Sequence, residues 1–210
     1  MHNLLARLKP IIIELEHHLE RDDFSRPVEI AELVALFSKH ADREIEVLEV
    51  NFKLEKLSGL NVSFPGSKKT LIFIRPCEES HAFDPRCEQC RGLRFAIAKE
   101  LVHICDSQSD KTPPAAIRAE LLEGLVTLDL DQSGAFAEFI AEFGATELLA
   151  PYAHRRLSVG SLTEETAKRT GDYEKLASQF GIPVRYAKIA FSDRYMEAIK
   201  EARQLRGLRG

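Results

Sequence analysis

The stretch R-F-A-I-A-K-E-L-V-H occupies residues 94–103 and decides how the rest of the chain is interpreted. Its last five residues fall one short of H-E-x-x-H, a motif in which two histidines one helical turn apart bind zinc and the glutamate acts as general base. The chain keeps Glu100 and His103 but has Lys99 at the position of the first histidine. A lysine ammonium has no free lone pair, so Lys99 cannot ligate a metal while it is protonated.

The apolar spacing around this stretch predicts a helix over residues 93–105, which would place Lys99 and His103 on one face. A third metal ligand must come from another element. The best candidate is a second predicted helix over residues 135–149, which carries Glu138 and leads into L-L-A-P at residues 148–151.

Together, the two segments resemble the ImmA/IrrE family of metallo-endopeptidases. Residues 94–103 correspond to the family's R-F-x-x-A-H-E-x-x-H, and residues 138–151 correspond to its E-x-x-x-N-x-x-A-x-x-L-L-x-P. Glu138 then matches the third zinc ligand, and Glu142 replaces the usual asparagine. The resemblance covers residues 28–200 and implies an α+β, zincin-like domain with a small mixed sheet and a helical bundle. It also implies a role in controlling a transcriptional regulator.

Lys99 is compatible with the implied fold but not with the implied zinc chemistry. A catalytic zinc normally has three protein ligands and a water, and only His103 and Glu138 remain competent here, with Glu100 as the general base if the site is active. The sequence therefore favours no zinc at this site. We expect the Lys99 ammonium to replace the metal electrostatically by pairing with Glu138 or Glu100. A shifted zinc site, completed by His81 or a cysteine such as Cys87, is the alternative.

The cysteines are Cys77, Cys87, Cys90 and Cys105. Cys87 and Cys90 have C-x-x-C spacing, and Cys77 and His81 lie nearby in the sequence, so Cys77, His81, Cys87 and Cys90 form a candidate structural metal site. No second close pair follows, as a zinc ribbon would require. Reduced free cysteines are therefore the alternative.

Three runs predict strands, at residues 45–50, 60–64 and 70–74, and the turn signal at Pro65-Gly66-Ser67 predicts that the last two form a hairpin. Further predicted helices cover residues 3–20, starting or kinking near Pro10, then 25–40, 115–130 and 163–170. The predicted organisation is an N-terminal helix over residues 1–25, a zincin-like peptidase domain over 26–151, and a helical, basic C-terminal segment over 152–210.

The C-terminal segment contrasts in charge with the rest of the chain. Residues 152–210 contain 12 Lys and Arg against 7 Asp and Glu, a local charge of +5, which leaves 17 against 26, or −9, elsewhere. Residues 172–180, Gly181 and residues 183–191 predict helix, turn and helix, with Arg185, Tyr186 and Lys188 pointing outward. Arg185 and Lys188 are thus candidate nucleic-acid contacts. The alternative is a helical cap of the domain with a solvated charged face.

No apolar run approaches the roughly 18 residues of a membrane span, and residues 1–9 lack the apolar region of a signal peptide. We therefore predict a cytoplasmic protein with no membrane partner. The predicted function is a degenerate metallo-endopeptidase domain that acts as a regulatory module binding a protein partner, a transcriptional regulator by the resemblance. An active zinc endopeptidase and a DNA-binding regulator are the alternatives.

Overall fold

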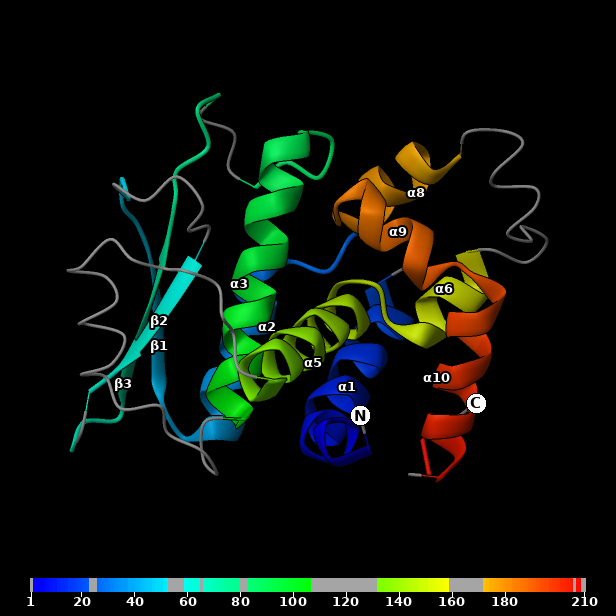
Figure 1. The fold of residues 1–210 in the computed structure, drawn as a ribbon, viewed down its shortest axis with the longest axis horizontal. Helices are drawn as coiled ribbons and strands as arrows, with labels where there is room; N and C mark the ends of the chain where they lie inside the picture. The colour runs from blue at the N-terminus through cyan, green and yellow to red at the C-terminus, as the bar shows by residue number, and fades with distance from the viewer. Residues whose placement is uncertain are drawn as a thin grey trace.

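The computed structural model describes residues 2–22, 26–52, 59–64, 66–79, 83–106, 132–158, 172–205 and 207–208 of the 210-residue chain. Within these ranges, eight helices and a three-stranded sheet form an α+β fold, as predicted (Figure 1). The helices are α1 (His2–Asp22), α2 (Ile30–Ala41), α3 (Glu88–Asp106), α5 (Gln132–Leu149), α6 (Tyr152–Ser158), α8 (Tyr173–Phe180), α9 (Val184–Ala190) and α10 (Asp193–Leu205). The strands are β1 (Glu44–Glu49), β2 (Gly59–Ser63) and β3 (Lys69–Ile74).

The sheet is mixed, in the order β1-β3-β2. β2 pairs antiparallel with β3, with Leu60 opposite Phe73, which confirms the predicted hairpin. β1 pairs parallel with β3, with α2 contacting β1, and α3 contacting both β2 and β3. In β3 the buried positions alternate as Thr70, Ile72 and Ile74. One face of this strand therefore packs into the core, because successive side chains of a strand point to opposite faces of the sheet.

One hydrophobic cluster joins the described helices from both ends of the chain. It includes Leu8 and Leu15 of α1, Leu101 of α3, and Ile199 of α10, all fully buried. In Figure 1 the sheet lies on one side of α3, and α1, α5, α6 and α10 lie on the other. None of the helices within the described ranges is long and apolar enough to cross a membrane.

Several element boundaries differ from those predicted. α1 begins at His2 and continues through Pro10, because the buried stripe that includes Leu8 and Ile12 outweighs the hydrogen bond that proline removes. α2 begins at Ile30 instead of near residue 25. Just before this start, the backbone carbonyl of Val28 accepts a hydrogen bond from Arg94.

α3 begins at Glu88, five residues before the predicted start at residue 93. Gly92 and the cysteines have weak helix propensity, but Cys90, Arg91 and Leu93 are buried and stabilise the first turns through tertiary contacts. The sequence did not predict α6, which directly follows Pro151. The predicted helices at 115–130 and 163–170 lie outside the described residues.

The buried guanidinium of Arg94 connects α3 to three distant segments. Arg94 is 1% exposed and donates to the backbone carbonyls of Val28 (2.5 Å), Phe83 (3.3 Å) and Gly181 (3.2 Å). Burial lowers the pKa of Arg94, while Glu29 and Cys90 act in the opposite direction. Arg94 thus fixes the entry to α2, the chain before α3 and the α8–α9 turn relative to one another.

Replacing Gly181 should reveal how tightly this arrangement is packed. Gly181 has φ 63°, and a Cβ there would lie 2.9 Å from Arg94 Cζ, whereas Gly66 has φ 78° and open space around it. We expect Gly66→Ala to lower the free energy of unfolding by about 1 kcal/mol, the cost of the left-handed backbone. Gly181→Ala should cost about 2–4 kcal/mol because it adds overpacking. Equal losses in urea denaturation would contradict this account.

Candidate functional site

A cleft of about 480 Å³ runs along the first half of α3. Its base is α3, and its sides come from the segment after β3, from α5 and from the start of α9. The charged residues that line it are Arg75, Glu78, Lys99, Glu142 and Arg185, and the apolar ones include Leu93, Phe95, Ala96, Pro183 and Tyr186. The cleft thus combines apolar residues with charges of both signs.

One side of the cleft is built on an aromatic stack between α3 and α9. The rings of Phe95 and Tyr186 lie 3.7 Å apart between centroids, at 13°. The Tyr186 hydroxyl donates to Glu142 Oε1 (2.7 Å) and accepts from Arg185 Nη2 (2.6 Å). Burial and the Glu142 carboxylate raise the pKa of Tyr186, so its hydroxyl stays protonated. The prediction that Tyr186 points outward is wrong, since it is 4% exposed and held by Phe95.

Glu100 is buried beside the edge strand of the sheet. Its side chain is 6% exposed, and its Oε2 accepts a 2.6 Å hydrogen bond from Asn61 Nδ2 of β2. A Cβ at Gly59 would lie only 3.3 Å from Glu100 Cγ, so β2 approaches α3 closely here. Sequence reasoning missed Asn61, because the alternation in residues 60–64 puts it on the polar face, which solvent normally covers.

Lys99 and His103 lie one turn apart on α3, and both are half-buried. Lys99 lines the cleft. α5, which contains Glu138, packs against α3 (Figure 1), but the Glu138 side chain lies outside the described part of the chain. Its pairing with Lys99 therefore stays a prediction. The donor set does not fit a catalytic zinc, because an ammonium replaces one of the three ligands that such a site needs.

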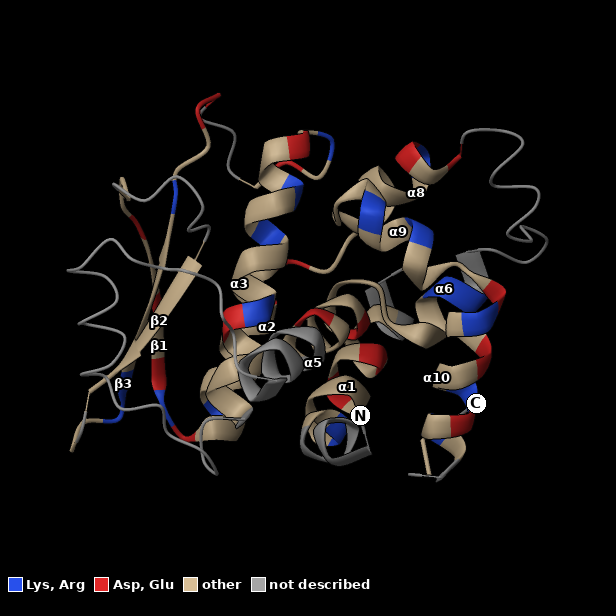
Figure 2. Ribbon diagram, viewed as in Figure 1, with Lys and Arg blue, Asp and Glu red and all other residues tan. Residues whose placement is uncertain are grey.

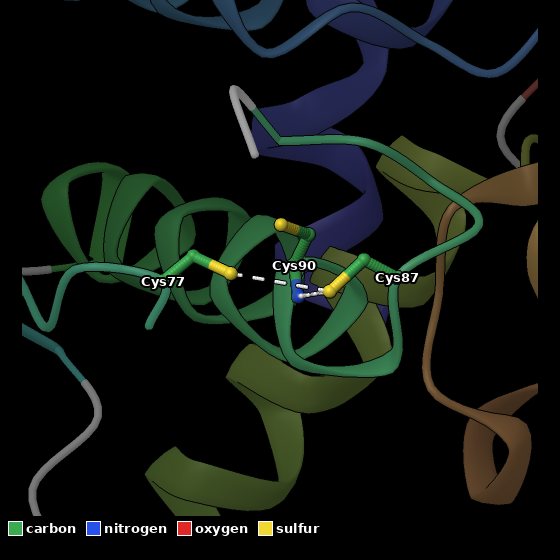
Figure 3. Close-up of side chains that lie close together, drawn as sticks. All are labelled: Cys77, Cys87 and Cys90. Atoms are coloured by element: carbon green, nitrogen blue, oxygen red, sulfur yellow. Dashed lines mark hydrogen bonds between the residues drawn. The ribbon is translucent and has the colours of Figure 1, made fainter. Parts of the chain in front are cut away.

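A second group of candidate residues lies at the start of α3. The Sγ atoms of Cys77, Cys87 and Cys90 all lie within 4.8 Å of one another, and none of these cysteines is in a disulfide. The sulfurs of Cys77 and Cys87 point toward each other at 3.9 Å, and the Cys90 backbone N–H donates to Cys87 Sγ at 3.5 Å (Figure 3). Burial and the two neighbouring thiols raise the pKa of Cys90 to about 12. His81, the fourth predicted ligand, lies outside the described residues.

The predicted helix, turn and helix are present as α8, Gly181 and α9. Arg185 and Lys188 are exposed on α9, as predicted. Arg185, however, is engaged with Tyr186, its Cζ lying 4.5 Å from the ring centroid. In Figure 2, α8 and α10 carry both acidic and basic residues, whereas the charged residues of α9 are basic.

Comparison with family models, with curated proteins and with solved structures finds no match to this chain. The likeness to the ImmA/IrrE family therefore rests on the two sequence segments at residues 94–103 and 138–151.

A double-mutant cycle should measure the link between Asn61 and Glu100. We expect Asn61→Ala to lower the free energy of unfolding by about 1–3 kcal/mol, because the buried carboxylate loses its amide donor. In the Glu100→Ala background the same change should cost less, giving a coupling energy of about 0.5–3 kcal/mol. Ser63→Ala is the control, since its hydroxyl pairs with Thr70 (3.0 Å) and should be additive with Glu100→Ala. Additivity for Asn61 as well would refute the link.

Proposed function

We propose that this chain is a degenerate ImmA/IrrE-type metallo-endopeptidase domain that binds a protein partner in the cleft along α3 without cleaving it. One observation carries the proposal: Lys99 lines the cleft, one helical turn before His103, at the position where the resemblance would require a zinc-binding histidine. The cleft thus has room for a ligand, while the residue at this position cannot bind a metal when protonated.

The chemistry of the neighbouring residues also argues against hydrolysis. A metallo-endopeptidase relies on its metal to acidify the attacking water and to polarise the carbonyl. Lys99 supplies positive charge but no lone pair for a metal. Glu100, at the position of the general base, is buried and hydrogen-bonded to Asn61, an arrangement that suits a structural carboxylate.

The cleft has the character expected for binding a peptide segment. Its volume falls in the range of about 300–1,000 Å³ that is typical of ligand pockets. Three cations, Arg75, Lys99 and Arg185, outnumber two carboxylates, Glu78 and Glu142. A segment with an apolar anchor and an acidic residue would complement this set. By resemblance to the family, the partner is a transcriptional regulator.

The sheet offers a second element for recognition. Among the strands of the described residues, β2 lies at an edge of the sheet, and a strand edge can pair with an extended segment of a partner. β2 begins at Gly59, which packs close to Ala96 and Glu100 of α3, and Ala96 also lines the cleft. A partner segment that pairs with β2 would therefore lead directly into the cleft.

Metal content and peptidase activity test the loss of catalysis. We expect Lys99→His to bind one zinc per chain more than the wild type, because it restores the third ligand, and His103→Ala to remove that extra zinc. The wild type should not cleave peptide substrates. Glu100→Gln should change neither the metal content nor this lack of peptidase activity. The proposal fails if the wild type holds zinc that His103→Ala removes and has peptidase activity that Glu100→Gln abolishes.

Binding is tested by charge reversal in the cleft. We expect Lys99→Glu and Arg185→Glu each to weaken binding of a partner, identified by cross-linking from the cleft, by about tenfold or more, since hydrogen bonds to charged groups contribute about 1.5–3 kcal/mol. Lys200→Glu, an exposed change on α10, is the control and should have no effect. Salt-dependent DNA binding that Lys188→Glu abolishes and Lys99→Glu leaves intact would favour the DNA-binding alternative.

A further inference from the structure

We infer that Cys77, Cys87 and Cys90 form a structural site for a single zinc ion. These three residues come from two segments, the chain that follows β3 and the start of α3. The inferred site does not involve Lys99 or His103, and it stands whether or not the proposed function is correct.

The sulfur positions fit one tetrahedral ion. Zinc–sulfur bonds of about 2.3 Å in a tetrahedron separate the sulfurs by about 3.8 Å. Cys77 Sγ and Cys87 Sγ are 3.9 Å apart, and all three sulfurs lie within 4.8 Å of one another (Figure 3). The remaining sulfur separations exceed this tetrahedral distance by no more than about 1 Å. A water or another group can take the fourth position, as in other zinc sites with three protein ligands.

Burial and the neighbouring thiols keep Cys90 protonated in the absence of a metal, so the thiolates would form as the ion binds and displaces the thiol protons. Cys87 immediately precedes α3 and Cys90 lies in its first turn, where the helix dipole stabilises negative charge. The backbone N–H of Cys90 already points at Cys87 Sγ. Arg94, one turn further along α3, is a buried cation whose hydrogen bonds to Val28, Phe83 and Gly181 all go to neutral backbone carbonyls. Three thiolates and one Zn²⁺ carry a net charge of −1, which would complement this guanidinium.

Residues that pack around the three cysteines, and a route from the surface to the sulfurs, are also present. Leu93 and Phe83 pack with the cysteines in a small apolar cluster, which limits solvent around a bound ion, and Phe83 also packs against the main core. Gln89 Oε1 accepts from Cys77 Sγ (3.4 Å) and from the Glu78 backbone N–H (3.1 Å). A surface depression borders Cys87 and gives an ion a path to the sulfurs.

Zinc uses all three sulfurs, whereas a disulfide would join two and leave the third unused. A disulfide also requires an S–S distance of about 2.05 Å, well below the observed 3.9 Å. Binding would release the three thiol protons to solvent without any change of oxidation state. The ion would fasten the segment from Cys77 to Cys87 onto α3, and this stapling is the role we assign to it.

Metal analysis of the full-length chain, purified without chelators and supplied with Zn²⁺ alone, tests the inference. We expect about one zinc per chain in the wild type and loss of that zinc in Cys87→Ser. Cys105→Ser is the matched control, because Cys105 lies at the other end of α3; it and His103→Ala should both retain the metal. Replacement by Co²⁺ should give the visible absorption of tetrahedral thiolate coordination.

A labelling experiment on the unmutated protein guards against variants that fail to fold. Cys87 should resist a thiol reagent while zinc is bound and should react once a chelator removes the metal. Reaction of Cys87 at the same rate with and without zinc would overturn the inference. So would an intact mass that is lower by two hydrogens, which would indicate a disulfide, or zinc that survives Cys87→Ser but is lost in His103→Ala.

Discussion

The arrangement of the described segments depends on one buried cation, the guanidinium of Arg94. Burying a charge is costly unless its donors are satisfied, and Arg94 is satisfied by carbonyls of Val28, Phe83 and Gly181. These three residues come from distant parts of the sequence, so their segments must be in place together. Gly181 can approach so closely because it lacks a Cβ and adopts the left-handed backbone that ends α8.

This constraint also determines the cleft. With the α8–α9 turn held against α3, Tyr186 stacks on Phe95 and its hydroxyl reaches Glu142 of α5. Three helices thereby contribute to the cleft, and their relative positions follow from buried contacts. The charged ends of Lys99 and Arg185 line the resulting space. A recognition surface supported in this way needs little reorganisation when it binds, which lowers the entropic cost of association.

The sequence predicted those parts of the fold that local patterns encode. The alternation at residues 60–64 and the turn that follows predicted the β2–β3 hairpin, and helical periodicity predicted α5, α8 and α9. It did not predict the early start of α3 or the inward position of Tyr186, because both depend on burial against distant segments. For the same reason, the partners of Glu100 and Arg94 could not be read from spacing, although both residues lie in the stretch that decided the fold.

The two candidate sites on α3 differ in electrostatic environment because they lie at different distances from the N-terminus of the helix. At the start of α3 the Cys90 backbone N–H donates to Cys87 Sγ, and three sulfurs lie within 4.8 Å of one another, so the cysteine cluster can hold a cation once its thiols lose their protons. At Lys99, three turns later, the helix dipole contributes little, and the side chains alone set the charge. Gln89 belongs to both sites, since it accepts from the Cys77 thiol and lines the cleft. An ion on the cysteines would therefore stiffen the Glu78 and Gln89 side of the cleft while taking no part in chemistry at Lys99.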